Sequence, residues 1–478
     1  MVFALPQFYL SAFGVDCNYI VIRGKIMLKE KYVHWEEDIT ITRSSNNRYL
    51  LFNTANEKDK YIINDVCFEI VSLCNGLNRI SDICQKCAEK YSVPYEEAEG
   101  NVVELLDSIE KEYQLKLVYS DNPARNPVTI NIETFYFPQV ATLELTQQCN
   151  LRCIHCYGNY GGEIKQKKLS FEECKKILLD LKNNDIKILE LTGGEITIHP
   201  DFEQILEFAV TCGFERIALL TNGLRFSEKT KEILIKNRNL FSIQIDLHSL
   251  DEQYLKWFTQ CENVLEPVQK NIRFCVENNI RLRLATIVTP RNLDEVESIV
   301  DWGFHARADG LAIGIVQNLG RAQMNDSLIL KDEKNWKKFG SILDKVVLKY
   351  PDFITEIDVT RLEDANCGSI SSHIVIGTDG ETKLCSLDAL NRLNSSLGNV
   401  LQNGLKDLYT KNKEFILSYG NLKSPKKDSK ECSECVNRGF CDGCLYRAFI
   451  RGTELGDRCG WYKNVPEIVK QKLNPISN

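Results

Sequence analysis

The sequence lacks the features that mark two broad classes of protein. Over its 478 residues, Lys and Arg (59) are fewer than Asp and Glu (66), and the formal net charge is −7. A protein that binds nucleic acid through a basic surface has the opposite balance, so we expect no nucleic-acid partner. No apolar run reaches the 18 or more residues of a transmembrane helix, so we expect no membrane span.

The first residues also lack a secretory signal, because no basic segment precedes the apolar stretch and no small-residue cleavage motif follows it. The pattern of a folded domain begins at Met27, so we interpret residues 1–26 as an extension and Met27 as an alternative start. The chain also offers no convincing Ser–His–Asp triad and no pair of carboxylates for acid–base catalysis.

Cysteine, in contrast, is abundant. The chain has 19 cysteines, and clustered cysteines in a long chain are more typical of metal or redox sites in cytoplasmic proteins than of disulfide scaffolds. We therefore expect a cytoplasmic protein. Ten cysteines fall in two groups, within residues 149–156 and 367–459. The others are scattered, and even the C-x-x-C pair Cys84 and Cys87 fits a buried packing role better than a metal site.

The first part of the chain predicts a small α+β domain. Three short β-rich runs (38–44, 48–53 and 60–65) precede three helical patterns (65–76, 79–91 and 95–115). This order is winged-helix-like, and we assign the domain to residues 27–118. An exposed strand edge can bind an extended peptide as an added strand, and the domain has no basic face for DNA. The prolines in residues 119–139 predict a linker.

Residues 140–350 predict parallel β/α units. Helical patterns alternate with candidate strands at 140–146, 186–192, 215–221, 241–247, 281–288 and 310–316, which indicates an α/β fold. Six units are too few for a closed eight-stranded barrel, so we expect an open, partial (β/α)6 barrel. Residues 351–478 lose the alternation and carry seven cysteines, which predicts a metal-stabilised C-terminal domain with little apolar core of its own.

Chemistry in such folds collects at the carboxyl ends of the strands. The first predicted strand is followed by Cys149, Cys153 and Cys156, the second by Gly193, Gly194 and Glu195, and the fourth ends at Asp246 and His248. Zinc would need a fourth ligand such as His155. An iron–sulfur cube normally has four thiolates, so three would leave one iron open to a substrate or cofactor.

The C-x3-C-x2-C motif at 149–156, with GGE at 193–195, resembles the radical S-adenosylmethionine (SAM) enzymes. The resemblance implies a [4Fe-4S] cluster on the three cysteines, with SAM on the open iron. It implies Gly193, Gly194 and Glu195 near the SAM amino group and His155 beside the adenine. It makes Asp246 and His248 candidates for ribose contacts, although many relatives have serine at the position of Asp246. Arg283 is a candidate contact of the SAM carboxylate, or alternatively part of a charged strand-end pair.

The C-terminal cysteines resemble the SPASM domain, which holds two auxiliary [4Fe-4S] clusters. The resemblance implies one cluster on Cys432, Cys435, Cys441 and Cys459 and another on Cys367, Cys385 and Cys444. Two spacings depart from the usual pattern: between Cys367 and Cys385, and between Cys441 and Cys444. The second cluster therefore lacks a fourth thiolate or uses Glu363 or Asp364. Two structural zinc sites are the alternative.

The order of recognition domain, radical SAM core and SPASM domain resembles the maturases of sactipeptide bacteriocins. The first domain is similar to the peptide-recognition element of pyrroloquinoline quinone assembly. The resemblance implies thioether bonds from a Cys sulfur to an α-carbon in a precursor peptide with a leader, and an electron donor such as flavodoxin or ferredoxin. Alternatives are Cβ or Cγ thioethers, epimerised or oxidised residues, and a non-catalytic peptide-binding or redox-sensing protein.

Overall fold

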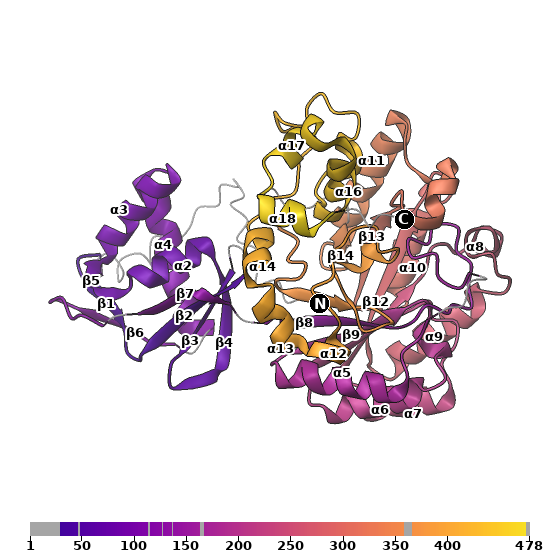
Figure 1. Cartoon of the computed structure of the whole chain (residues 1–478), viewed down its shortest axis with the longest axis horizontal. Helices are drawn as coiled ribbons and strands as arrows, with labels where there is room; N and C mark the ends of the chain where they lie inside the picture. The colour runs from indigo at the N-terminus through magenta and orange to yellow at the C-terminus, as the bar shows by residue number, and fades with distance from the viewer. Residues whose placement is uncertain are drawn as a thin grey trace. The chain divides into compact units, whose positions relative to one another are not determined.

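A computed structural model describes residues 29–45, 48–112, 115–126, 128–135, 137–162, 167–357 and 366–474. The chain forms two compact units, Met1–Phe135 and Tyr136–Asn478. Figure 1 labels their helices and strands. The expected extension at 1–26 lies outside the described residues.

The first unit contains the predicted three-stranded meander followed by three helices, and two further features that we did not expect. Strands β2, β3 and β4 form an antiparallel meander, and β7 extends their sheet in parallel with β2, giving the order β4-β3-β2-β7. A second sheet has the order β5-β1-β6. The elements are β1 (Tyr32–Trp35), β2 (Ile39–Ser45), β3 (Arg48–Asn53), β4 (Asn56–Asn64), α2 (Asp65–Leu73), β5 (Asn75–Arg79), α3 (Ile80–Tyr91), α4 (Tyr95–Glu112), β6 (Leu117–Ser120) and β7 (Thr129–Phe135).

The interval 119–139, which we expected to be a linker, contains the second half of β6 and all of β7. Its prolines at 123, 127 and 138 all lie outside these two strands, so they do not interrupt the ladders. Cys84 and Cys87 lie on α3 and are almost fully buried in the core of this unit, as the packing interpretation predicts.

The second unit is built on a nine-stranded sheet of order β14-β13-β12-β11-β10-β9-β8-β15-β16. All neighbouring strands from β14 to β15 are parallel, and β16 is antiparallel to β15. The six predicted core strands are confirmed. The strands are β8 (Val140–Thr146), β9 (Ile188–Gly193), β10 (Arg216–Thr221), β11 (Phe241–Asp246), β12 (Arg281–Val288), β13 (Gly310–Ile315), β14 (Ile354–Ile357), β15 (His373–Ile376) and β16 (Thr382–Lys383).

Helices connect the core strands, as the alternating pattern predicts. Helix α5 (Phe171–Asn183) starts at a capping box in which Ser170 and Glu173 satisfy each other's backbone amides. It lies beside α6 (Phe202–Thr211) and α7 (Glu228–Lys236) along one side of the sheet (Figure 1). Further along the chain are α8 (Glu252–Thr259), α9 (Leu265–Glu277), α10 (Val296–His305) and α11 (Glu333–Lys349).

The C-terminal segment belongs to the same compact unit as the core strands, Tyr136–Asn478. Strand β15 lies parallel to β8, so residues of the last quarter of the chain complete the sheet of the core. All seven residues of β8 are buried, because neighbours cover both its edges. The segment also has its own apolar core, in which Tyr409, Tyr419 and Phe449 are fully buried. Its helices are α12 (Val400–Asn403), α13 (Leu405–Lys411), α14 (Lys413–Gly420), α15 (Arg438–Cys441), α16 (Leu445–Leu455), α17 (Gly460–Lys463) and α18 (Glu467–Lys472).

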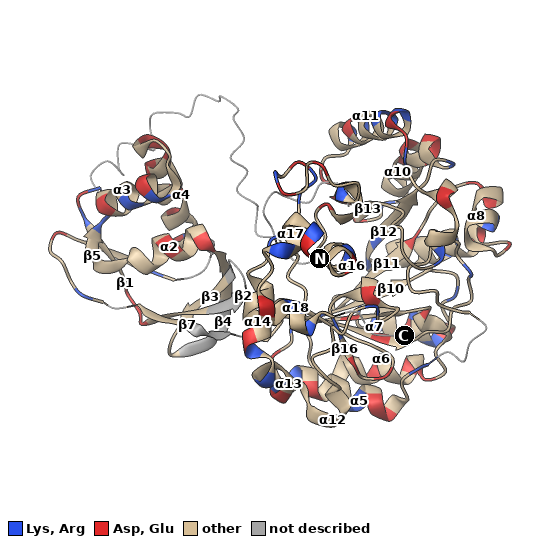
Figure 2. Ribbon diagram, turned by 45° about the horizontal axis from the view of Figure 1, so that its top comes forward, with Lys and Arg blue, Asp and Glu red and all other residues tan. Residues whose placement is uncertain are grey.

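Charges of both signs are interspersed over the helices, as Figure 2 shows for α5, α11 and α13. In the part of the chain that the structure describes, no helix has the length and apolar composition that crossing a bilayer requires.

Candidate functional site

A cavity of about 310 Å³ lies at the carboxyl ends of the core strands. This is where parallel β/α folds place their ligands, and the volume lies within the usual range of small-molecule sites. Nine of its lining residues carry the argument below: Cys149, Cys153, His155, Cys156, Gly193, Gly194, Asp246, His248 and Arg321.

The cysteine loop after β8 is held from one side by Arg321, which sequence reasoning missed. Its Nε donates to the carbonyl of Cys153 (2.8 Å), its Nη1 donates to the carbonyl of Tyr160 (2.9 Å), and its backbone amide donates to the carbonyl of Cys156 (3.0 Å). Arg321 follows the sixth core strand, about 165 residues beyond the motif. Its preceding residue, Gly320, has φ +54°, and a Cβ there would lie 2.3 Å from the carbonyl oxygen of Tyr157.

The end of α8 holds the same loop from its other side. The backbone amides of Arg152 and Ile154 donate to the carbonyls of Thr259 and Phe258, both at 2.9 Å. The loop therefore takes its shape from backbone contacts with two distant segments, and the three thiols remain free to face the cavity.

The two glycines after β9 permit a close approach to the cysteine loop. The amide of Gly194 donates to the carbonyl of Thr146 (2.7 Å). A Cβ on Gly193 would lie 2.3 Å from the Thr146 oxygen, and one on Gly194 would lie 2.1 Å from the Gln148 oxygen. Gly193 also has φ +142°, which other residues rarely adopt. The glycine pair therefore has a direct structural role in placing the cysteines.

Glu195 is buried behind the cavity and does not line it. One carboxylate oxygen accepts from the hydroxyls of Thr197 and Thr221, both at 2.7 Å, and the other accepts from the backbone amide of Asn222 (2.8 Å). Its carboxylate thus ties the end of β9 to the end of β10. Thr221 and Asn222 line the cavity in its place.

His155 and His248 form an aromatic wall. The ring of His155 stacks on Phe258 (centroids 4.2 Å apart, interplanar angle 5°) and meets His248 edge-on at 5.2 Å. Burial lowers the pKa of His155 well below its usual value and lowers that of His248 to about 4. Both rings are therefore neutral at pH 7, so the wall is suited to a flat uncharged ring.

Asp246 and Arg283 differ in whether they reach the cavity. Asp246 lines the cavity, and burial together with the charge of Glu195 raises its pKa to about 7. Arg283 lies near the start of β12, and it is Ala285 and Ile287, further along the same strand, that line the cavity. Arg283 instead pairs with Glu356 (3.1 Å) and contacts Gln244. Its ion-pair partner is therefore Glu356, and not Asp246 as the alternative of a charged strand-end pair supposed.

The three thiols of the loop lie close together at the cavity. Burial raises the pKa of Cys149 to about 11 and that of Cys153 well above its usual value, and the neighbouring cysteines of the loop add to both shifts. Among the described residues, no three His, Cys, Asp or Glu side chains converge on one point as a single bound ion requires. A cube binds each thiolate through a different iron, so a set of separate thiols at one wall fits a cluster.

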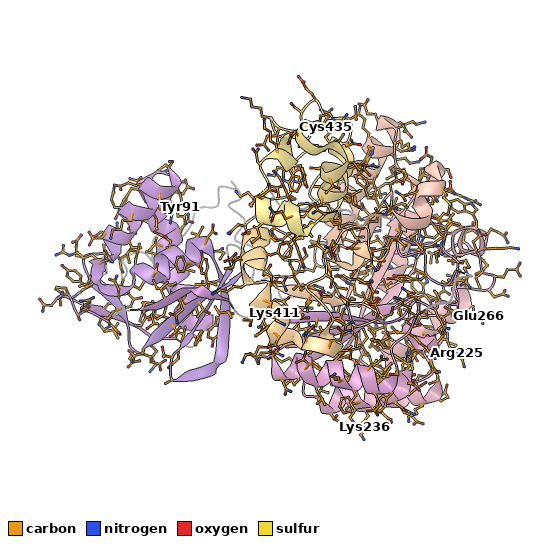
Figure 3. The ribbon with its side chains drawn as sticks, viewed as in Figure 1. Tyr91, Arg225, Lys236, Glu266, Lys411 and Cys435 are labelled. Carbon is orange, nitrogen blue, oxygen red and sulfur yellow. The ribbon has the colours of Figure 1, made fainter. Side chains whose placement is uncertain are left out.

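The C-terminal cysteines gather in two sets. Burial raises the pKa of Cys441, and Cys459, Cys435 and Cys432 add to that rise; burial likewise raises the pKa of Cys385, and Cys444 and Cys367 add to it. These are the two groups that the SPASM resemblance implies. Figure 3 labels Cys435 in the C-terminal segment that carries α16 and α17. Glu363 and Asp364, the expected alternatives for a fourth ligand, lie outside the described residues.

Two tyrosines that sequence reasoning missed join the cavity to the second set. Tyr157 and Tyr160 line the cavity, and the pKa of Tyr157 is raised by burial and by Glu144, Cys156 and Cys385. The charges of Cys156 and Cys385 both act on Tyr157, so each of these cysteines lies in its neighbourhood. Its place directly after the last cysteine of the motif is the one sequence signal that could have indicated it.

Comparisons with known proteins agree with this geometry. Residues 143–303 match the family described as the Radical SAM superfamily, and residues 54–113 match coenzyme PQQ synthesis protein D (PqqD). The subtilosin biosynthesis protein AlbA of Bacillus subtilis is 26% identical over 87% of this chain and 92% of its own length. The sporulation killing factor maturation protein SkfB of the same organism is 28% identical over 39% of this chain and 45% of its own.

The fold is similar to that of solved structures as well. Streptococcus suis SuiB bound to its precursor peptide SuiA has a TM-score of 0.55 at 13% identity, covering 92% of this chain and all of that one. SuiB bound to S-adenosylmethionine has a TM-score of 0.54 at 16% identity, covering 87% of this chain and 96% of that one. Residues 143–303 therefore form a radical SAM domain with a PqqD domain ahead of it, and over most of its length the chain is similar to a bacteriocin biosynthesis protein.

Proposed function

We propose that this enzyme joins cysteine sulfurs to α-carbons within a ribosomally made precursor peptide. The observation that supports it best is one cavity that is lined by the three thiols of the loop and by Tyr157, whose pKa the charge of Cys385 helps to raise. Bond formation between a carbon radical and a sulfur leaves one surplus electron, so an acceptor beside the cavity suits this reaction. The names of AlbA and SkfB, and the SuiB–SuiA complex, support a peptide substrate.

Cys149, Cys153 and Cys156 would hold the cluster that binds SAM, in agreement with their shared place in the cavity. When bound, the cluster supplies one electron that cleaves SAM to methionine and a 5′-deoxyadenosyl radical. His155 would stack on the adenine, and Asp246 and His248 would contact the ribose. Gly193 and Gly194 would lie beside the amino group, and Glu195 would act through Thr221 and Asn222.

Arg321 is a better candidate than Arg283 for the SAM carboxylate, because it lines the cavity and Arg283 does not. We expect Arg321→Met to weaken SAM binding at least tenfold, because a charge-assisted bond is worth about 1.5–3 kcal/mol. Arg283→Met is the matched control and should change it less than twofold. Equilibrium dialysis of labelled SAM measures both. Equal weakening by the two variants would contradict the assignment to Arg321.

The seven C-terminal cysteines would hold two auxiliary clusters, one on Cys432, Cys435, Cys441 and Cys459 and the other on Cys367, Cys385 and Cys444. Because the charge of Cys385 acts on the cavity residue Tyr157, we propose the second set as the electron acceptor. The electron donor that reduces the cluster at the SAM site would be a flavodoxin or a ferredoxin.

The product tests the proposal directly. Incubating the enzyme with SAM, a reductant and its precursor should lower the peptide mass by two hydrogens per bridge, with an equal loss of free thiols. Mass spectrometry measures the change, which should persist in a disulfide reductant. A Cα thioether should open during gas-phase fragmentation.

The other outcomes identify the alternatives. A bridge that resists fragmentation would place the sulfur on Cβ or Cγ. An unchanged mass with an inverted residue would indicate epimerisation. A mass change that a reductant reverses would be an ordinary disulfide, and a protein that cleaves no SAM would be a non-catalytic binding or redox-sensing protein.

The PqqD domain would bind the leader of the precursor along β4, which is an edge strand of its sheet. A peptide added there satisfies the unpaired amides and carbonyls of the edge. We expect a chain that begins at residue 136 to cleave SAM in the absence of peptide as the full chain does. It should need about tenfold or more peptide for half-maximal modification.

A precursor without its leader is the matched control for this truncation. The full chain should modify it as poorly as the truncated chain does, and the truncated chain should not distinguish the two peptides. If the truncated chain modifies the complete precursor as efficiently as the full chain, the domain has another role.

A further inference from the structure

Helix α8 carries a second pocket, of about 480 Å³, which we call the outer pocket. It is lined by Lys256 and Trp257 of the helix, by Cys261 and Glu262 just after it, and by Arg291 after β12. The helix residues that line the reaction cavity are instead Leu255 and Thr259. Since residues four apart lie on one face of a helix, the cavity and the outer pocket lie on different faces of α8.

The outer pocket has cationic groups that lack a carboxylate partner. Lys256 pairs with Glu262 (2.5 Å). Arg291 is exposed, and its guanidinium carbon lies 4.5 Å from the centre of the Trp257 ring. Among the described residues, no Asp or Glu forms an ion pair with Arg291. A guanidinium on an aromatic face keeps its N–H fork free for a carboxylate, so the pocket is suited to an acidic surface.

Aromatic rings connect the outer pocket to the cysteine loop. The centre of the Trp257 ring lies 6.0 Å from that of Phe258, and Phe258 stacks on His155 at 4.2 Å. His155 directly precedes Cys156. The carbonyl of Phe258 also accepts from the amide of Ile154 (2.9 Å), which is the residue after Cys153. The outer pocket is therefore separated from the loop by the Phe258 side chain and one turn of backbone.

The other approaches to the cysteine loop are occupied. The cavity would hold SAM and the peptide during the reaction. The segment of Arg321, which supports the loop from its other side, is covered in part by the C-terminal segment, because Arg392 donates to Gln323 and Arg447 donates to Gln317. In contrast, α8 lies at the outer margin of the second unit in Figure 1. A protein that delivers electrons while the cavity is filled can approach the loop along this helix.

We propose that the outer pocket docks the electron donor, and that this donor is an acidic flavodoxin. Carboxylates of the flavodoxin would bind Arg291 and Arg152, whose backbone amide joins the end of α8 to the loop. The apolar edge of its flavin would contact Trp257. The flavodoxin loses one electron to the cluster that the cysteine loop would hold, and no bond or proton changes place. The inference rests on that proposed cluster but not on the bond made in the peptide.

The first test measures the binding of oxidised flavodoxin to the reconstituted enzyme. Arg291→Glu should raise the Kd about tenfold or more, because it removes a charge-assisted contact and places like charges together. Lys256→Glu should have a smaller effect in the same direction, because Arg291 remains. Lys236→Glu, at the exposed end of α7 (Figure 3), is the matched control with the same change in net charge. It should change the Kd less than about twofold.

A footprint locates the flavodoxin on the surface. Cys261 lines the outer pocket and is partly exposed, so bound flavodoxin should slow its alkylation severalfold. Cys212 is also partly exposed but lies after α6, outside the pocket, and its alkylation should not change. Mass spectrometry of the digested enzyme measures both thiols in one sample. In Arg291→Glu the protection of Cys261 should disappear at the same flavodoxin concentration.

The choice of reductant separates docking from a structural role. Without peptide, SAM cleavage driven by reduced flavodoxin should fall about tenfold in Arg291→Glu at a low flavodoxin concentration, and it should recover as that concentration is raised. Cleavage driven by dithionite, a small reductant that needs no docking surface, should equal that of the wild type.

Three results would overturn the inference. The first is a wild-type Kd for flavodoxin together with wild-type protection of Cys261 in Arg291→Glu. The second is an equal loss of cleavage with dithionite, which would show that the pocket only supports the cysteine loop. The third is weakened binding of the precursor alone, which would make the pocket a peptide site. If the wild type cleaves no SAM with either reductant, the proposed function fails, and the footprint on Cys261 still decides where flavodoxin binds.

Discussion

Changing Cys149, Cys153 and Cys156 together to Ala should abolish SAM cleavage and leave the fold intact. The three thiols are the ligands at the cavity, whereas Arg321 and the end of α8 hold their loop through its backbone. Anaerobically reconstituted enzyme should contain roughly twelve irons with matching sulfide, and the variant about eight, because one cube of three is lost. Iron and sulfide analysis, circular dichroism and 5′-deoxyadenosine assays measure these effects.

Cys212→Ala is the matched control for that experiment. Cys212 follows α6, is partly exposed and does not line the cavity, so its loss should leave iron content and SAM cleavage unchanged. Zinc without sulfide in the wild type would contradict the assignment of clusters. So would a triple variant that keeps its full iron content.

Lys383→Met should cause the largest loss of stability of any single substitution that we consider. The side chains of Lys383 and Glu144 are 6% and 1% exposed, and the variant leaves the carboxylate buried and unpaired. Removing one partner of a buried ion pair typically costs about 3–5 kcal/mol. Lys167→Met breaks the more exposed pair with Asp379 (2.9 Å) and should cost less than about 1 kcal/mol.

The loss of stability in Lys383→Met should increase as the pH rises. Burial raises the pKa of Glu144, and Lys383 opposes that rise, so the pKa in Lys383→Met should be higher still. A carboxyl whose pKa is raised on folding binds more protons in the folded state. Stability is therefore retained at low pH and lost as pH rises from the unfolded pKa through the folded one.

Denaturation of anaerobic protein at pH 6 and pH 8 measures this dependence. The difference between variant and wild type should be larger at pH 8. Adding Glu144→Gln should recover much of the loss, because no unpaired charge then remains. A variant as stable as the wild type at pH 8 would contradict the importance of the pair.

The parts of the site that the sequence predicts are those encoded next to a strand end. The three cysteines, the Gly193–Gly194 pair and the Asp246–His248 pair each lie at or just after the end of a strand, and the parallel sheet brings them to one cavity. The interactions that the sequence does not reveal join distant residues. Arg321 lies 168 residues from Cys153, and Lys383 lies 239 residues from Glu144.

Arg283 and Glu195 show a second limit of sequence reasoning. Both belong to segments that reach the cavity, but the depth of a side chain along a strand decides what it contacts. Arg283 lies two residues before Ala285, about 7 Å lower on β12, and so remains below the cavity. The carboxylate of Glu195 is directed away from the cavity because the next strand and the residue after it offer it a hydroxyl and an amide.

The pairing of β8 with β15 has a consequence for the way the protein is made. Ribosomes add about 5–20 residues per second, and 233 residues separate the starts of these strands (373 − 140), so β8 waits roughly 12–47 s for its second neighbour. During that interval one edge of β8 is unpaired. The three thiols that follow β8 have then been synthesised, but the complete sheet has not yet formed. The cluster on Cys149, Cys153 and Cys156 would then be loaded only after β15 has been synthesised, and not as the cysteine motif leaves the ribosome.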